Sequence, residues 1–245
     1  MFVKLILSFV SFYCASAALP SYIQVCKKNV PDMTACIINS VDTLRPKLAE
    51  GIPELGVPSI EPLPLPEIKL RSGPKSAKID ANITNIKVWG PSSFEVLELR
   101  PEVAKNRFVF RINIPHLYFK GDYDIDINVV ILKYKGQGPI TGNFTNMQAD
   151  VLLKGHLKEI DGKAHLHFEK FKIQLSIQKS YLHLGELFAQ QAHLGTATNE
   201  VINGNSDLFV NEIKPALESS LADIFTEAAN SICKSFTYDE LFPEN

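Results

Sequence analysis

Strict alternation of apolar and polar residues dominates the middle of the chain, from about residue 76 to residue 185. Such runs place large apolar side chains on one face of a strand and polar side chains on the other. Because a sheet with one solvated face is antiparallel, this region predicts a long antiparallel sheet. The apolar positions that carry the alternation include Phe108, Phe110, Ile112, Ile114, Tyr123, Ile125, Ile127, Val129, Met147, Val151, Leu153, Ile173 and Leu175.

Interruptions of this alternation predict a bulge and several turns. The apolar phase slips by one position after Ile83, which predicts a β-bulge near Asn85. Glycine-containing segments at 120–122, 136–139 and 161–163 predict turns between strands. A strand between the first two of these turns would be about 45 Å long at roughly 3.3 Å per residue. Strands of that length must twist and curl.

The C-terminal part of the chain carries one apolar stripe at steps of three and four residues. A helix over residues 207–234 would be about 42 Å long, similar to the strands. A long sheet and a long helix that are each apolar on one side must bury those sides on each other. The prediction is an α+β fold in which a strongly curved antiparallel sheet wraps around the helix. The stripe includes Ile213, Leu217, Leu221, Ile224 and Ile232.

A curled sheet on a single helix leaves a lengthwise seam between them. If side chains leave the seam unfilled, it is an apolar tunnel suited to a water-insoluble ligand. The alternative is a close-packed core without a ligand, and periodicity alone does not decide between the two. The candidate tunnel walls are the strand and helix positions named above, and Trp89 is either a wall residue or a core aromatic.

The region before the sheet predicts a helix and a stiff connection. Residues 32–50 have helical periodicity, with Asp32 or Thr34 as the N-cap. Pro46 is expected to interrupt the last turn of this helix, and the glycine after residue 50 ends it. The proline-rich segment 51–67 is expected to be extended and to lie over the surface like a strap.

The first 18 residues, MFVKLILSFVSFYCASAA, combine one lysine, a short apolar run and small residues at their end. This is the pattern of a secretory signal peptide, so residues 19–245 would form the single mature domain. A membrane anchor is the alternative, but the run is too short to span about 30 Å of hydrocarbon. A formal net charge of −2 argues against nucleic acid as a partner, and 45% hydrophobic residues argue against disorder.

Secretion changes how the remaining cysteines are interpreted. Cys26 and Cys36 are ten positions apart, and an oxidising compartment favours a bridge between them. A metal or redox pair is the alternative, but CxxC spacing and a nearby histidine are missing. Cys233 lies on the helical pattern and is expected to be a buried free thiol. The sequons at Asn82 and Asn143 are candidate glycosylation sites.

Patterns typical of catalysis or metal binding are weak in this sequence. The GxSxG pattern of hydrolases is missing, so an esterase acting on bound lipid lacks a recognisable nucleophile. Asp122, Asp124 and Asp126 share one strand face and favour a solvated surface over a calcium site. His165 and His167 also share a face, but the sequence identifies no third zinc ligand. We therefore expect no catalytic residue, no metal and no cofactor.

Several motifs in order carry a family resemblance. Residues 26–70 read CKKNVPDMTACIINSVDTLRPKLAEGIPELGVPSIEPLPLPEIKL, and GDYDID follows at 121–126. Together with the segments at 211–217 and 238–243, these resemble the insect takeout and juvenile hormone binding protein family. The resemblance covers essentially the whole mature chain.

The resemblance implies a tubular lipid-binding fold, with the family's N-terminal bridge at Cys26 and Cys36. It also implies a secreted, non-catalytic carrier of terpenoid, fatty acyl or quinone-like ligands in haemolymph or sensory fluid, with roles in feeding, chemosensation or clock-linked behaviour. The second bridge of juvenile hormone carriers has no counterpart, because Cys233 lacks a partner; this favours the takeout branch.

We expect a monomer without nucleic acid or a transmembrane segment, and any receptor is unidentified. The alternative is a secreted interaction or signalling protein with a structural lipid or a filled core.

Overall fold

The computed structural model describes residues 20–72, 78–129, 132–188 and 192–244, so the predicted signal peptide lies outside the described residues. The helices are α1 (Met33–Glu50), α2 (Ala192–Gly204), α3 (Ser206–Ser235) and α4 (Tyr238–Leu241), with 3₁₀ turns at Pro53–Leu55, Pro91–Ser93 and Val103–Lys105. The strands are β1 (Leu63–Leu65), β2 (Ile68–Ser72), β3 (Lys78–Trp89), β4 (Glu95–Glu102), β5 (Arg107–Val129), β6 (Leu132–Ile160), β7 (Lys163–Phe168) and β8 (Lys172–Leu184).

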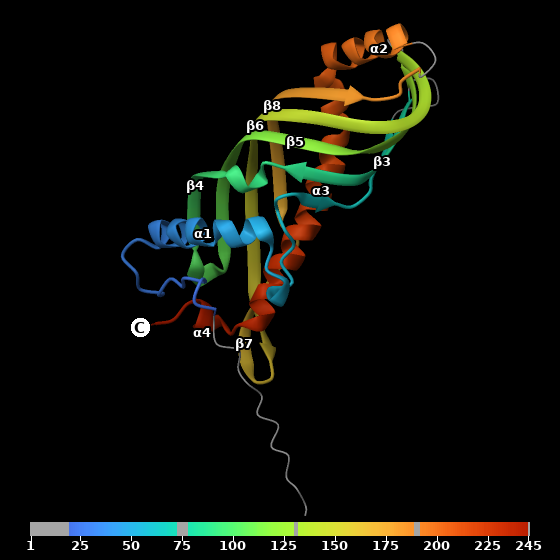
Figure 1. Cartoon of the computed structure of the whole chain (residues 1–245). Coiled ribbons are helices and arrows are strands. Elements are labelled where there is room, and N and C mark those ends of the chain that lie inside the picture. Colours follow the sequence, from blue (N-terminus) through green and yellow to red (C-terminus); the bar gives the residue numbers. More distant parts are fainter. Residues whose placement is uncertain (1–19, 73–77, 130–131, 189–191, 245) are drawn as a thin grey trace, which may run out of the picture.

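The described strands form one eight-stranded sheet in which every pairing is antiparallel. Its main path runs β1-β3-β5-β6-β7, while β2 pairs with β3, β4 with β5, and β8 with β6. The 23-residue β5 and the 29-residue β6 form its spine. Figure 1 shows these strands curving strongly toward α2, and the sheet does not close on itself. The predicted fold class is confirmed.

The predicted bulge in β3 is confirmed. The register between β3 and β5 shifts between Thr84 and Lys87, and Asn85 has a φ of 53°. The Asn85 side-chain amide donates a hydrogen bond of 2.7 Å to Asp122 on the outer face of β5. The bulge returns Ile86 to the buried face, which is the apolar pattern visible in the sequence.

Two predicted turns are wrong. β5 continues through Gly121, and β6 continues through 136–139, whereas the turn at 161–163 is present between β6 and β7. The glycine in β5 lies beside the bulge, where an added Cβ would be 2.8 Å from the Thr84 carbonyl oxygen. Close approach between strands therefore requires this glycine, and the sequence pattern cannot distinguish that need from a turn.

The predicted C-terminal helix is confirmed as α3, which continues through Pro215. Figure 1 shows α3 running the length of the sheet, with α2 at one end and the β6–β7 hairpin and α4 at the other. We call these the α2 end and the α4 end. α2 was not predicted from the sequence.

The N-terminal region follows the prediction in part. Asp32 caps α1 by accepting a hydrogen bond from Ala35 N–H at 2.9 Å, and the Cys26–Cys36 disulfide is present. The helix continues through Pro46 to Glu50 instead of being interrupted. The proline-rich segment does more than cross the surface. It buries apolar side chains and contributes β1 to the sheet edge; the buried residues are Ile52, Leu55, Val57, Ile60 and Leu63.

Candidate functional site

The inward face of the sheet and one side of α3 form a continuous apolar interior. Most predicted wall residues lie there, because alternation along each strand directs them to the same side. The buried ones are Phe108, Ile114, Tyr123, Ile125, Ile127, Met147, Val151, Leu175 and Leu221. Half-buried ones that pack against this core are Phe110, Ile112, Leu153, Ile173, Ile213 and Leu217.

Among the described side chains, three predicted wall residues do not join this interior. Trp89 follows the bulge on the outer face, where its ring centroid lies 5.6 Å from that of Tyr118. Ile232 packs against a separate small core around Phe236, and the half-buried Ile224 belongs to neither core. The side chain of Val129 lies outside the described residues. Trp89 follows the inward-facing Val88 and so lies on the outer face, which makes both expectations for it wrong.

Tyrosine hydroxyls lie at the α2 end of the interior. Tyr123, only 2% exposed, donates a hydrogen bond of 2.7 Å to the Gly185 carbonyl. Burial raises the pKa of the Tyr123 phenol, and its neighbour Tyr134 adds to this rise, so the hydroxyl stays protonated. Tyr134 packs against Phe188 with ring centroids 4.9 Å apart. Tyr118, by contrast, lies on the outer face of the sheet.

Phenylalanine rings fill the α4 end of the interior. Phe108 lies between Phe168 and Phe242, with ring centroids 6.1 and 6.3 Å away. Phe171 contacts Phe168 edge-on at 5.7 Å. Sequence reasoning missed Phe168 and Phe242 because each lies beyond the end of a clear alternating run. The two ends of the interior therefore differ: the Tyr123 and Tyr134 phenols lie at the α2 end, and a cluster of phenylalanine rings lies at the α4 end.

Side chains of α2 and α3 bond the free edge of β7 and β8. The Leu182 N–H donates to Asn203 Oδ1 at 2.8 Å, and the Leu175 N–H donates to Glu218 Oε1 at 2.8 Å. Farther along, the Phe171 N–H donates to Thr226 at 2.9 Å. We call this boundary the polar seam. It satisfies strand groups that would otherwise need another strand.

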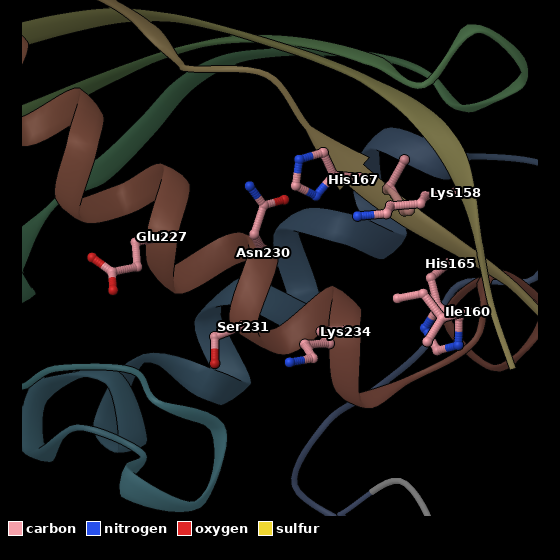
Figure 2. A pocket seen from close by; sticks show the side chains of 9 residues that line it. Lys158, Ile160, His165, His167, Glu227, Asn230, Ser231 and Lys234 are labelled. Atoms are coloured by element: carbon pink, nitrogen blue, oxygen red, sulfur yellow. The ribbon is translucent and has the colours of Figure 1, made fainter.

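Two pockets open along this seam. One, of about 510 Å³, lies between the β6–β7 hairpin and α3. Figure 2 shows the side chains that line it. A second pocket of about 270 Å³ lies between β8 and α3. Both contain lysine, asparagine and serine side chains, so neither is the enclosed apolar tunnel that the sequence suggested. That tunnel remains a prediction.

The larger pocket contains both candidate zinc ligands. His165 donates through Nδ1 to the Cys233 carbonyl at 3.0 Å, while the His167 ring lies 5.4 Å from that of His156. Within the described ranges, no group of three histidine, cysteine or acidic side chains is arranged to hold a metal. Cys233 itself is buried and unbridged, as expected.

Comparison with known proteins identifies a family and several relatives. A family model described as haemolymph juvenile hormone binding protein matches residues 5–243. The circadian clock-controlled protein daywake of Drosophila melanogaster is 24% identical over 236 residues, covering 93% of this chain and 90% of that protein. A Schistocerca gregaria protein named "Putative beta-carotene-binding protein" is 23% identical over 224 residues, covering 90% and 88%.

A solved structure shares the fold. Takeout 1 of Epiphyas postvittana superposes with a TM-score of 0.74 at 17% identity, covering 85% of this chain and 95% of that one. Within the described part of this chain, no helix is long and apolar enough to cross a bilayer.

Proposed function

Because the chain belongs to the haemolymph juvenile hormone binding protein family, we propose that it is a secreted, non-catalytic carrier of a small hydrophobic ligand. The observation that carries this proposal is the apolar interior between the curved sheet and α3, which extends from Tyr123 at the α2 end to Phe108 at the α4 end. The family binds hydrophobic ligands and is not known for catalysis.

The proposed ligand is an elongated terpenoid, fatty acyl or quinone-like chain. An elongated interior fits a chain better than a compact molecule, and the name of the Schistocerca gregaria relative points to an isoprenoid. Burial of apolar surface at about 25 cal/mol per Å² would drive binding, after the costs of association are subtracted. A polar ligand head would meet the hydroxyls of Tyr123 and Tyr134, and the apolar tail would meet the phenylalanine rings.

The polar seam is the proposed place where the interior widens for a ligand. β5 and β6 are joined along more than 20 residues, whereas α3 is joined to the sheet edge by separate side-chain hydrogen bonds. Fewer backbone bonds must be broken to move α3 than to separate two strands.

Export is part of this proposal. The first 18 residues would be removed as a signal peptide, leaving residues 19–245 as one lipid-binding domain, which we propose acts as a monomer in haemolymph or sensory fluid. The daywake relative supports a clock-linked role, and a chemosensory role is an alternative of the same class. Export would also expose Asn82 and Asn143 to the glycosylation machinery.

A secreted interaction protein with a filled core is the second candidate. The observation in its favour is the dense burial of the interior: Tyr123, Ile125 and Ile127 are each at most 6% exposed. In that case the interior would be structural, and the protein would act through its surface.

Uptake of a hydrophobic fluorescent probe, and its displacement by a terpenoid, a fatty acid and an isoprenoid quinone, tests the carrier proposal. Ile127→Trp should weaken uptake roughly tenfold, or about 1.4 kcal/mol, by filling the interior. Leu97→Trp is the matched control, because Leu97 is 51% exposed. Near-ultraviolet circular dichroism verifies that both variants fold. Unchanged uptake by a folded Ile127→Trp protein would refute this placement of the ligand.

A further inference from the structure

Four neighbouring strands place one row of residues across the outer face of the sheet. Trp89 on β3 is opposite Tyr118 on β5, Tyr118 is opposite Asn143 on β6, and Asn143 is opposite Tyr181 on β8. Figure 1 shows these four strands side by side. Because directly opposite residues share a face, the row is continuous, with a polar residue between two tyrosines. We call it the aromatic row.

The aromatic row faces solvent. Tyr118 is 40% exposed and Tyr181 is 54% exposed, whereas Phe119 and Phe144, which follow Tyr118 and Asn143 in the chain, are buried on the opposite face. Lys120 lies with its Nζ 5.2 Å from the Trp89 ring centroid. Neighbouring exposed aromatic rings offer apolar surface for contact with another group.

Asn143 itself is the acceptor of the sequon Asn143-Phe144-Thr145. Its side chain is exposed, and its amide makes no hydrogen bond to the residues that the structure describes. Phe144, the middle residue of the sequon, points inward and stacks on Phe119 with ring centroids 5.4 Å apart. Its side chain therefore does not cover Asn143. The acceptor nitrogen therefore faces solvent in the folded protein.

We propose that Asn143 carries an N-linked glycan whose first N-acetylglucosamine covers the aromatic row. Adjacent strands are roughly 4.8 Å apart, so a sugar attached at Asn143 begins between the rings of Tyr118 and Tyr181. The C–H bonds on the face of a sugar ring are attracted to the negative face of an aromatic ring. The glycan would shield this apolar surface while the sides of the molecule formed by α1 and α3 stay open. This proposal rests on the export proposed above.

The other sequon provides a contrast. Asn82 is half-buried, and its side chain is already hydrogen-bonded to Glu67. Its Oδ1 atom is buried without a partner, and its strand neighbours are Lys69 and Asp124, so no aromatic ring flanks it. A glycan at Asn82 would displace the hydrogen bond to Glu67 and would have no aromatic ring to stack on. The geometry assigns the glycan to Asn143 and leaves Asn82 unmodified.

Secretion of the full chain from insect cells, followed by enzymatic deglycosylation and peptide mass spectrometry, tests the assignment. We expect the electrophoretic shift of one glycan, located at Asn143. Thr145→Ala should abolish the shift, whereas Thr145→Ser, which keeps the sequon, should retain it. Thr84→Ala, which removes the other sequon, should also leave the shift unchanged. A secreted protein with an unmodified Asn143, or with its glycan only at Asn82, would overturn the proposal.

A double-mutant cycle tests whether the first sugar stacks on the rings of Tyr118 and Tyr181. Thr145→Ala should lower the melting temperature more in the wild-type background than in the Tyr118→Ala/Tyr181→Ala background, because only the wild type loses sugar–ring contacts. Thr145→Ser, which keeps the glycan, is the control in each background. If Thr145→Ala lowers the melting temperature equally in both backgrounds, the sugar does not stack on the two tyrosine rings.

A glycosylated protein that takes up no ligand would contradict only the carrier function. A ligand-binding protein without the glycan would contradict only this assignment, and intracellular retention without a glycan would overturn both.

Discussion

The side-chain amide of Asn199 replaces a neighbouring strand for the Leu184 peptide. The Leu184 N–H donates to Asn199 Oδ1 at 2.9 Å, and Asn199 Nδ2 donates to the Leu184 carbonyl at 2.9 Å. Asn203 bonds Leu182 in the same paired way. Residues four apart on a helix share one face, so α2 presents both amides to the edge of β8.

Asn230 repeats this relationship at the far end of the polar seam, where it bonds the N–H and the carbonyl of Phe168 at 2.8 and 3.0 Å. An amide carries both a donor and an acceptor, so it satisfies a strand edge completely. The helices thereby cover an edge that would otherwise pair with another chain.

Removing one of these amides should destabilise the protein. We expect Asn199→Ala to lower the free energy of unfolding by about 1–3 kcal/mol, because both polar groups of Leu184 lose a buried partner. Urea denaturation measures this. Asn205→Ala is the control, because the exposed Asn205 side chain, between α2 and α3, bonds the Val201 carbonyl of α2 and no strand. Equal stability of the two variants would contradict the role of the polar seam.

The disulfide should contribute through the unfolded chain. Cys26 and Cys36 close a loop with a sequence separation of 10, so replacing both by serine should cost about 2–3 kcal/mol. Thermal unfolding with and without a reducing agent measures this. The reductant should destabilise the wild type and leave the double-serine variant unchanged, and a response of both proteins would contradict the prediction.

Phe236 joins the proline-rich segment to the end of α3. Its side chain is 1% exposed and packs with Ile52, Leu55 and Val57. We expect Phe236→Ala to cost about 3–5 kcal/mol in unfolding free energy, measured by urea denaturation, because it leaves a cavity. The exposed Leu208→Ala should stay within about 0.5 kcal/mol. A change of less than about 1 kcal/mol for Phe236→Ala would mean that packing on Phe236 does not stabilise the proline-rich segment.

Cys233 should be inert in the folded protein. Burial raises the pKa of its thiol to about 12, so the reactive thiolate is scarce at pH 8. A chromogenic thiol reagent should react only after unfolding, and rapid reaction with the native protein would contradict the burial.

The Cys233 thiol also makes the free energy of unfolding depend on pH. The unfolded thiol ionises near its ordinary pKa of about 8.5, while the folded thiol keeps its proton. Its contribution is therefore complete below about pH 8.5 and decreases as pH rises toward 12. Cys233→Ala should reduce this alkaline loss of stability, which urea denaturation at several pH values measures. Identical pH profiles for the two proteins would contradict it.

Local patterns predicted much of this fold. Alternation identified the strands, the phase slip located the bulge at Asn85, and the apolar stripe located α3. The turn predicted at Gly121 was wrong because this glycine allows a close approach between two strands. α2 was missed because Asn199 and Asn203 join it to the edge of β8, and local periodicity does not reveal such a tertiary contact.

The candidate site was harder to predict than the fold. Alternation selects which side of a strand is apolar, so most wall residues were assigned to the interior. Trp89, expected as a wall residue or a core aromatic, instead lies on the outer face beside Tyr118. Alternation also cannot distinguish a filled seam from an open one, because the same residues line both.

Native mass spectrometry of the secreted protein, followed by organic extraction and identification of whatever is bound, tests the carrier function most directly. The account predicts a stoichiometric terpenoid, acyl or quinone species that is released on unfolding, and an emptied protein that takes it up again. A ligand-free mass, together with failure to take up any of these molecules, would contradict it and leave the filled-core interaction protein as the better description.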